Sequence, residues 1–284
     1  MTSFPLASVV IPAHDEANVI GRLLRALLAD ARPGELEIVV VANGCTDLTA
    51  ETARSFGPDV RVVETKVASK VHALNLGDRA ATAFPRLYVD ADVVLDTRAV
   101  RETAAVLASG RALAAAPRLR VDLSGASAAV RGFYAVWTRH PHFRRGLVGS
   151  GVYGLSERGR RRFAQFPDVT ADDAFVHGLF TPAERMTVPT CHFTVRAPRT
   201  LKALVKIKTR SRRGNRELHG RFPALARPRG GGRAGLLASV ALRPHLWPSV
   251  PAYVAVTVAT AVNARRAPAR TRAWERDETS RTLS

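Results

Sequence analysis

Short apolar runs alternate with stretches of helical periodicity along the first ninety residues of the chain. The runs are rich in β-branched residues and end at proline, glycine or polar residues, as buried strands do. These predicted strands are Ala7–Ile11, Glu37–Ala42, Val60–Val63 and Leu87–Val89. Between them the apolar positions recur three and four residues apart, as on one face of a helix. These predicted helices are Ala17–Ala31, Leu48–Phe56 and Lys70–Ala83.

This alternation predicts an α/β fold whose sheet is mainly parallel, with helices on both faces. Ligands of such sheets bind beyond the carboxyl ends of the strands. Three polar segments stand at these ends: His14-Asp15-Glu16, Asn43–Asp47 and Asp90-Ala91-Asp92. Neither a G-x-G-x-x-G loop nor a Walker loop follows a predicted strand, which argues against NAD binding and P-loop chemistry.

The positive charge of the chain is concentrated in one segment. The formal net charge is +19, while 46% hydrophobic and 24% charged residues are typical of a globular protein and exclude a disordered or polytopic membrane chain. Residues 196–233 hold 13 basic residues and a single acid, Glu217. Such a segment implies a diphosphate, an anionic membrane surface or another polyanion as its partner. The two cysteines, Cys45 and Cys191, are too few for a disulfide framework or a cysteine-based zinc site and indicate free thiols.

Asp90 and Asp92 lie two residues apart where a predicted buried strand ends. On a strand this spacing points both carboxylates to the same face, and oxygen ligands suit Mg²⁺ or Mn²⁺. A turn-forming pair of aspartates is the alternative. We expect a metal site, because two acids beside a buried strand are costly without a partner.

Five segments, taken in order, resemble the family-2 inverting glycosyltransferases with the GT-A fold. They are Val9–Glu16, Val40–Asp47, Lys70 with Ala73–Gly77, Asp90–Asp92, and Asp172-Asp173. The resemblance covers roughly residues 7–220. It implies a catalytic domain at 1–220, with a nucleotide-binding half at about 1–95 and an acceptor half at about 96–220, followed by a helical C-terminal extension at 221–284.

The resemblance also implies an activity and its partners. The enzyme would transfer a sugar from a nucleotide-diphospho-sugar donor to a hydroxyl acceptor, lipid-linked or saccharide, with Mn²⁺ or Mg²⁺ as cofactor. In that reading Pro12, Ala13 and Glu16 line the base and ribose. Asn43 stands where many members have an aspartate that contacts the base, so this chain departs from the family there.

Further roles near the diphosphate follow from the same resemblance. Lys70 would lie near the nucleotide and Asp90 toward the ribose. Asp92 would bind the metal and the diphosphate, with Asp90 as a second metal ligand. Arg210, in the basic run, is expected to reach the diphosphate.

The acidic pair Asp172-Asp173 matches the position of the family's catalytic base. The resemblance places the base at its second residue, Asp173, where it would take the proton of the acceptor hydroxyl. The pair here is Asp-Asp rather than Glu-Asp, so Asp172 is a second candidate. Adjacent acids are also favourable at the start of a helix, whatever the chemistry.

Two segments between the acidic motifs carry structural expectations. Gly149-Ser150-Gly151 precedes a predicted strand at Val152–Leu155, and its glycines would let the backbone approach a sugar closely. Ser156 and the arginines between 158 and 162 predict a capped helix with a solvated basic face.

The basic segment 196–233 and the apolar stretch Leu236–Ala264 indicate where in the cell the protein is expected to lie. A helix is predicted at Thr200–His219, and its Lys206–Arg210 segment lacks the Gln-x-x-Arg-Trp motif of polymer-extruding synthases. Trp247, Tyr253 and flanking arginines at Leu236–Ala264 fit a membrane interface. We therefore expect a cytoplasmic protein, peripheral at the inner face of the cell membrane. A helix pair packed on the catalytic domain is the alternative.

Two other functions compete with sugar transfer. A sugar nucleotidyltransferase also uses a parallel sheet and a metal, but its glycine-rich, lysine-bearing loop is missing after the first strand. A nucleic-acid-binding module could use residues 196–233, but only one aromatic residue, Phe222, lies among the basic ones there. Nucleic acid is therefore not the expected partner.

Overall fold

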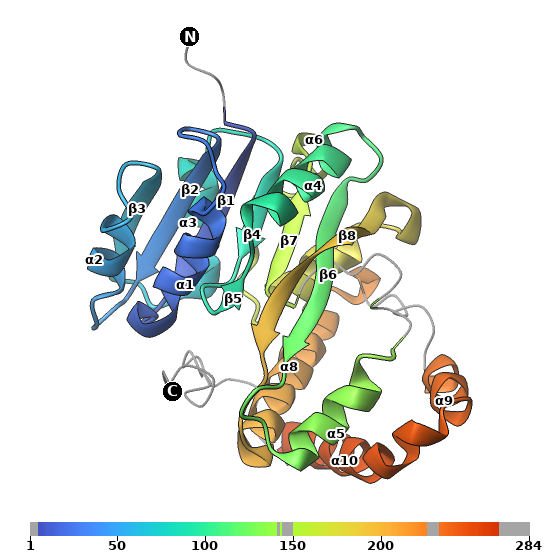
Figure 1. Cartoon of the computed structure of the whole chain (residues 1–284). Helices are drawn as coiled ribbons and strands as arrows, with labels where there is room; N and C mark the ends of the chain where they lie inside the picture. Colours follow the sequence, from blue (N-terminus) through green and yellow to red (C-terminus); the bar gives the residue numbers. More distant parts are fainter. Residues whose placement is uncertain (1–4, 141–142, 144–149, 226–232, 267–284) are drawn as a thin grey trace.

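A computed structural model describes residues 5–140, 143, 150–225 and 233–266 (Figure 1). Its centre is an eight-stranded sheet in the order β3-β2-β1-β4-β7-β6-β8-β5. The strands are β1 Ala7–Ala13, β2 Leu36–Asn43, β3 Val60–Thr65, β4 Arg86–Val89, β5 Val93–Val94, β6 Ala114–Asp122, β7 Val152–Leu155 and β8 Arg185–Arg196. The α/β fold class with a mainly parallel sheet over the nucleotide-binding half is confirmed.

The sheet changes direction beyond β4. Strands β3, β2, β1 and β4 are parallel neighbours, so their carboxyl ends share one edge. β7 then pairs antiparallel with both β4 and β6. β6 and β8 pair in parallel with a register shift between Pro117 and Arg118, and the short β5 pairs antiparallel with β8.

Four helices stand close to their predicted positions: α1 Ala17–Leu28, α2 Thr49–Arg54, α3 Lys70–Ala80 and α8 Leu201–Arg221. The other helices are α4 Thr97–Ala108, α5 Ala128–Trp137, α6 Glu157–Arg160, α7 Asp172–Leu179, α9 Arg233–Ala241 and α10 Val250–Arg266. Short 3₁₀ segments lie between some of these helices, at η2 Pro182–Glu184, η3 Pro223–Leu225 and η4 Pro244–Ser249.

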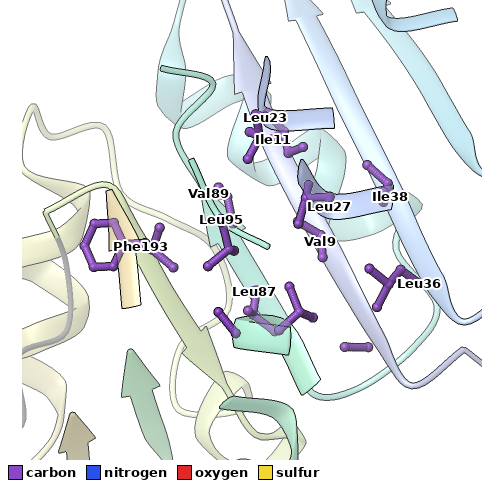
Figure 2. Packing of buried hydrophobic residues seen from close by; sticks show 14 of the residues in the cluster. Val9, Ile11, Leu23, Leu27, Leu36, Ile38, Leu87, Val89, Leu95 and Phe193 are labelled. Carbon is purple, nitrogen blue, oxygen red and sulfur yellow. The ribbon is translucent and has the colours of Figure 1, made fainter. Parts of the chain in front are cut away.

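Alternate residues of the parallel strands enter two different cores. Val9 and Ile11 of β1 pack with residues of α1 and α4, as Figure 2 shows for Val9, Ile11, Leu23 and Leu27. Val10 faces the other way and packs with residues of α3 and α7. Because strand side chains alternate between faces, apolar residues at every position mean a sheet covered on both sides.

Gly77 brings α3 unusually close to the sheet. A Cβ atom built at this position would lie 2.4 Å from Val10 Cγ1 and 3.0 Å from Val41 Cγ2. Only glycine allows α3 to approach the side chains of β1 and β2 this closely. Gly77 therefore fixes the distance between α3 and the sheet.

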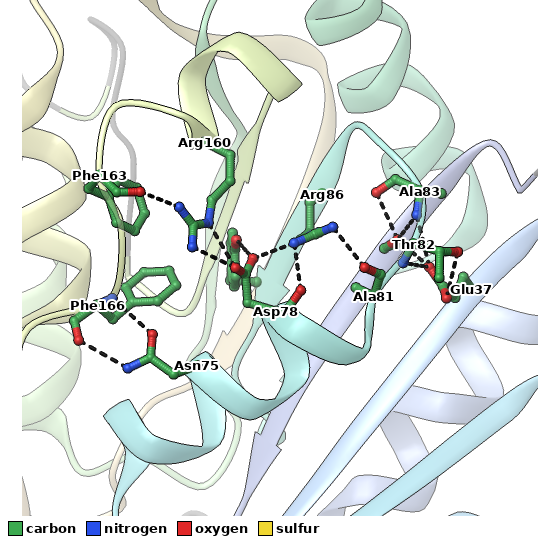
Figure 3. Close-up of polar contacts among 12 residues, drawn as sticks. Glu37, Asn75, Asp78, Ala81, Thr82, Ala83, Arg86, Arg160, Phe163 and Phe166 are labelled. Atoms are coloured by element: carbon green, nitrogen blue, oxygen red, sulfur yellow. Dashed lines mark hydrogen bonds and ion pairs between the residues drawn. The ribbon is translucent and has the colours of Figure 1, made fainter.

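A buried polar network aligns α3 with β4 (Figure 3). Asp78 accepts hydrogen bonds from Arg86 at 2.5 Å, from the Tyr88 hydroxyl at 2.5 Å and from Arg160 at 2.6 Å. Burial opposes ionisation of Asp78, but these three donors lower its pKa. Along α3, Lys70 lies about 12 Å from Asp78. Along β4 and the turn after it, Asp90 lies about 13 Å from Arg86. Because these two lengths are nearly equal, the contact between Asp78 and Arg86 at one end of the pair of elements brings Lys70 next to Asp90 at the other end.

The expectation of a solvated basic face after Ser156 is wrong for one arginine. Ser156 does cap α6, since its hydroxyl accepts a hydrogen bond from the Gly159 amide at 3.1 Å. Arg160, however, is 12% exposed, pairs with Asp78, and lies over the Phe163 ring at 4.3 Å. A basic pattern in the sequence does not reveal an acidic partner that lies 82 residues away.

The C-terminal helices pack on the rest of the protein. Arg212 and Arg216 of α8 donate to backbone carbonyls of Thr257 and Ala264 in α10, at 3.1 and 2.8 Å. Val256 of α10 is 1% exposed. Among the described residues, no helix combines the length and the apolar character needed to span a bilayer.

Candidate active site

A cleft of about 650 Å³ opens where the parallel and antiparallel parts of the sheet meet α7 and α8. Four acidic residues line it: Asp90, Asp92, Asp172 and Asp173. Lys70 and Arg210 line it as well. Six of the residues singled out in the sequence, spread over some 140 positions, are thus brought into one cavity.

Asp90 and Asp92 lie in the turn between β4 and β5. The Asp90 amide donates to the Gly151 carbonyl at 2.8 Å, so the turn is fastened to the segment before β7. Gly151 has a φ of +101°, and a Cβ there would approach Val93 Cγ1 to 2.9 Å and Asp90 Oδ2 to 3.6 Å. Glycine keeps the space beside the Asp90 carboxylate open. Gly149, the other glycine of the predicted motif, lies outside the described residues.

Lys70 bridges two of the acids. Its Nζ lies 2.7 Å from Asp90 Oδ1 and 3.1 Å from Asp172 Oδ1. Lys70 is the first residue of α3, and the Ser69 hydroxyl caps that helix by accepting from the His72 amide. The ammonium group thus ties the end of β4 to the start of α7.

Asp172 and Asp173 differ in their surroundings although they are adjacent. Asp172 is 3% exposed and accepts a hydrogen bond from the Tyr153 hydroxyl at 3.2 Å, in addition to its pair with Lys70. Asp173 is partly exposed and accepts from the Ser150 amide at 3.3 Å and from the Ala174 amide at 2.7 Å. The second acid therefore presents its carboxylate to the cleft, while the first is enclosed.

The charges in this cluster affect one another strongly. Burial raises the pKa of the Asp172 carboxyl, and the negative charges of Asp173 and Asp90 act in the same direction, against the opposing effect of Lys70. Burial alone would lower the pKa of Lys70, but the carboxylates of Asp172 and Asp90 raise it. Lys70 therefore stays charged and holds the acids together.

The residues expected to line the base and ribose lie elsewhere, at the ends of β1 and β2. Pro12, Ala13 and Glu16 are buried and do not line the cleft. Asn43 is fully buried, and its amide donates to the Ala13 carbonyl at 2.7 Å, which fastens β1 to β2. The Asn43 Oδ1 atom has no hydrogen-bond partner within the described part of the chain.

The loops after β1 and β2 are cross-linked by polar side chains. His14 Nδ1 lies 2.6 Å from the Asn43 carbonyl, and Asp15, which has a φ of 48°, accepts from the Thr46 amide at 2.6 Å. With Cys45, these two side chains bring potential ligand atoms within 4.8 Å of one another. Burial raises the pKa of the Cys45 thiol, so it is mostly protonated at neutral pH.

The far side of the cleft is aromatic. Phe133, Tyr134 and Trp137 of α5 line it together with Tyr253 of α10. Lys208 of α8 lies with its Nζ 3.7 Å from the centre of the Trp137 ring. Burial lowers the pKa of Lys208 to about 7.

Several residues of the site are not evident from local sequence patterns. Tyr153 occurs in a short apolar strand, where a tyrosine signals only burial. Tyr253, interpreted from the sequence as a membrane-interface residue, instead stacks on Phe133 with ring centres 5.6 Å apart. The aromatic spacing of Phe133, Tyr134 and Trp137 signals one helix face, but not the cavity that this face lines.

Comparison with protein families gives one match. Residues 8–154, just over half of the chain, match the family described as Glycosyl transferase family 2. The 4,4'-diaponeurosporenoate glycosyltransferase of Staphylococcus aureus is 34% identical over 100 residues, which are 34% of this chain and 26% of that protein. The match thus spans about a quarter of the relative's length.

Solved structures share the fold over more of the chain. A mannosyltransferase of Pyrobaculum calidifontis, solved with GDP-Man and Mn²⁺, has a TM-score of 0.64 at 23% identity, covering 92% of this chain and 76% of its own. Glucosyl-3-phosphoglycerate synthase of Mycobacterium tuberculosis, solved with Mn²⁺, UDP-glucose and glycerol 3-phosphate, has a TM-score of 0.54 at 19% identity, covering 76% and 79%. At these identities the likeness shows the fold.

Proposed function

Since this chain belongs to glycosyl transferase family 2, we propose that it transfers a sugar, with inversion, from a nucleotide-diphospho-sugar to a hydroxyl acceptor. The observation that carries the proposal is the convergence of Asp90, Asp92, Asp172 and Asp173 on one cleft, with Lys70 between them. Such a transfer needs a carboxylate base for the acceptor and positive charge for the departing diphosphate.

The donor set at the end of β4 fits a divalent ion. Asp90 and Asp92 offer carboxylate oxygens in one cleft, the ligand type that Mg²⁺ and Mn²⁺ prefer. The space that Gly151 keeps open lies next to the Asp90 carboxylate. We propose that both aspartates hold the ion, which would neutralise the charge of the diphosphate when bound. The relatives solved with Mn²⁺ support this choice of cofactor.

Asp173 is the better placed of the two candidate bases. A base must reach the acceptor, and Asp173 presents its carboxylate to the cleft, held by two backbone amides. Asp172 is enclosed by Lys70 and Tyr153 and has little freedom to receive a proton from a substrate. We assign Asp173 the proton of the attacking hydroxyl, and Asp172 the positioning of Lys70.

The nucleotide is proposed to extend from the metal site toward the ends of β1 and β2. Pro12, Ala13, Glu16 and Asn43 would then form the base and ribose end. Arg210 lines the cleft on α8 and is proposed to contact the diphosphate from the opposite side. Lys70 would stand next to the ribose through its pair with Asp90.

The test is a transfer assay with paired variants. The full-length protein is incubated with UDP-, GDP- or dTDP-sugars, Mn²⁺ and a panel of hydroxyl acceptors, and the anomeric configuration of the product is read by NMR. Asp173→Asn should lower kcat by roughly 10²–10⁴-fold with little change in donor affinity. Asp172→Asn should instead lower the stability of the fold.

The paired design allows the assignment to fail. If Asp172→Asn loses kcat at unchanged stability while Asp173→Asn stays active, the base is Asp172. Retention of the anomeric configuration would contradict the inverting mechanism. Release of pyrophosphate from a nucleoside triphosphate, without sugar transfer, would instead favour the nucleotidyltransferase alternative.

The C-terminal helices are proposed to dock on an anionic membrane surface. Five of the nine exposed large apolar side chains among the described residues fall within 22 positions: Leu237, Leu242, Trp247, Val254 and Val258. Arg265 and Arg266, at the end of α10, are exposed as well. Apolar residues flanked by arginines suit the headgroup region of a bilayer. In this reading the protein is peripheral at the inner face of the cell membrane.

Sedimentation with vesicles tests the docking surface. The full-length protein should pellet with phosphatidylglycerol vesicles at low salt and less at high salt, because the charge contribution is screened. Trp247→Ala, at a side chain 58% exposed, should weaken pelleting. Leu48→Ala, at a side chain 68% exposed near α2, is the matched control and should not. Protein that remains in the supernatant at low salt would contradict the proposal.

A further inference from the structure

One wall of the cleft is built from aromatic rings that belong to distant parts of the chain. Phe133 of α5 stacks on Tyr253 of α10, with centres 5.6 Å apart, and on Trp137, with centres 6.3 Å apart. We call Phe133, Trp137 and Tyr253 the aromatic wall. It lines the same cavity as Asp173, so a molecule lying on the wall shares the cleft with the proposed base.

Three polar groups next to the aromatic wall are engaged within the protein. His140 Nε2 lies 3.0 Å from the Tyr253 hydroxyl, and the Thr257 hydroxyl donates to the Tyr253 carbonyl at 2.7 Å. The Thr260 hydroxyl donates to the Thr257 carbonyl at 3.0 Å. A bound sugar ring would require hydrogen-bonding groups directed at its hydroxyls. The wall instead offers aromatic carbon with internally satisfied polar groups, which suits a hydrocarbon chain.

Lys208 of α8 lies against the aromatic wall. Its ammonium group lies 3.7 Å from the centre of the Trp137 ring and 5.6 Å from the centre of the Phe133 ring. Burial lowers its pKa to about 7, in spite of rings that favour the charged form. The rings of Phe133 and Trp137 thus line one side of this part of the cleft with aromatic carbon, and such a surface favours apolar ligands.

We infer that the acceptor is an amphipathic alcohol whose apolar chain lies on the aromatic wall, with its hydroxyl group directed at Asp173. The inference rests on the proposed transfer function and names the class of its acceptor. Burial of the chain provides affinity without contributions from hydrogen bonds, and it orients the hydroxyl within the cavity.

Two glycosides that carry the same sugar provide the test. Octyl β-glucoside, below its micelle concentration, and methyl β-glucoside are compared as acceptors of the full-length protein. Each methylene group removed from water contributes about a fourfold preference, so burial of four of the seven additional carbons favours the octyl compound by about 200-fold in kcat/KM. Trp137→Ala and Tyr253→Ala should each reduce this ratio by about tenfold or more.

Direct titration separates the acceptor class from the chemistry. In calorimetry without donor, octyl β-glucoside should bind with one-to-one stoichiometry and methyl β-glucoside should not. Leu48→Ala removes an exposed apolar side chain that lies outside both the cleft and the proposed docking surface, and it is the control for Trp137→Ala. Equal binding of both glycosides, or equal losses in the two variants, would overturn the inference. Transfer with equal kcat/KM for both acceptors would overturn it while leaving the proposed function intact. Octyl binding without transfer from any donor would instead count against the proposed function.

Discussion

Replacing Lys70 by methionine removes the positive charge that joins Asp90 to Asp172. The two ion pairs, at 2.7 and 3.1 Å, are lost together. The Asp90 side chain is 36% exposed and regains water. Asp172 is 3% exposed and, within the described part of the chain, keeps the Tyr153 hydroxyl as its side-chain partner. The cost of the substitution therefore arises mainly at Asp172.

The magnitude follows from the burial of Asp172. Removing one partner of a buried pair costs about 3–5 kcal/mol of unfolding free energy. We expect about 3 kcal/mol at neutral pH, because the Tyr153 hydrogen bond remains and the carboxyl can take up a proton. Its pKa, already raised by burial, rises further without Lys70. In the unfolded chain the pKa of an aspartate is about 3.9. Between that pH and the raised pKa of the folded variant, Asp172 binds more protons in the folded protein than in the unfolded chain. The variant therefore loses stability as the pH rises through this range.

Urea unfolding at pH 5 and pH 8, followed by circular dichroism, measures this difference. Lys70→Met should be less stable than wild type by more at pH 8 than at pH 5, with a slope of at most about 1.4 kcal/mol per pH unit. Lys66→Met removes the same charge from an exposed position four residues earlier and should change stability by less than about 0.5 kcal/mol. A loss equal to that of Lys66→Met, or one independent of pH, would refute the reasoning.

Three further substitutions test other parts of the structure. Asp92→Asn should abolish metal-dependent transfer and leave the melting temperature unchanged; full activity in excess EDTA would contradict it. Gly77→Ala should cost about 1–3 kcal/mol in urea unfolding, because its Cβ would meet Val10 at 2.4 Å, whereas Gly220→Ala, where nothing lies within 4 Å, should not destabilise. Lys208, whose pKa is lowered to about 7, binds fewer protons in the folded than in the unfolded chain above that pH. The unfolding free energy of the wild type should therefore rise from pH 7 to pH 9 relative to that of Lys208→Met. If the unfolding free energies of the two proteins change with pH in parallel, this prediction is wrong.

The parallel half of the fold could be predicted from local patterns because each element is specified by its own residues. Val9 and Val10 are both apolar because both faces of β1 are covered. Such a strand appears in the sequence as an uninterrupted apolar segment, which is the pattern that predicts a buried strand. Once the strands are parallel, geometry brings Lys70, Asp90 and Asp92 to the same edge. The order of the motifs was therefore enough to predict that Lys70, Asp90 and Asp92 lie close together.

Contacts between distant elements could not be predicted in this way. The role of Arg160 depends on Asp78, and that of Tyr153 on Asp172, and neither pairing leaves a periodic signal. A tyrosine such as Tyr253 suits a bilayer surface as well as it suits packing against Phe133. Composition alone therefore could not distinguish these two environments. The sequence favoured Asp173 over Asp172 only by resemblance to the family, because the difference in burial between the two acids leaves no local signal.

The contact between His140 and Tyr253 joins residues 113 positions apart. During synthesis β1 and β4, the strand that ends just before Asp90, emerge and can pair long before α10 leaves the ribosome, because domains form from the N-terminal side as the chain grows. The end of the cleft proposed to bind the donor can thus be structured while the aromatic wall proposed for the acceptor is still missing. A nascent chain at that stage would resemble a nucleotide-binding module with an open side, and selectivity for the acceptor would be the last property that the growing protein acquires.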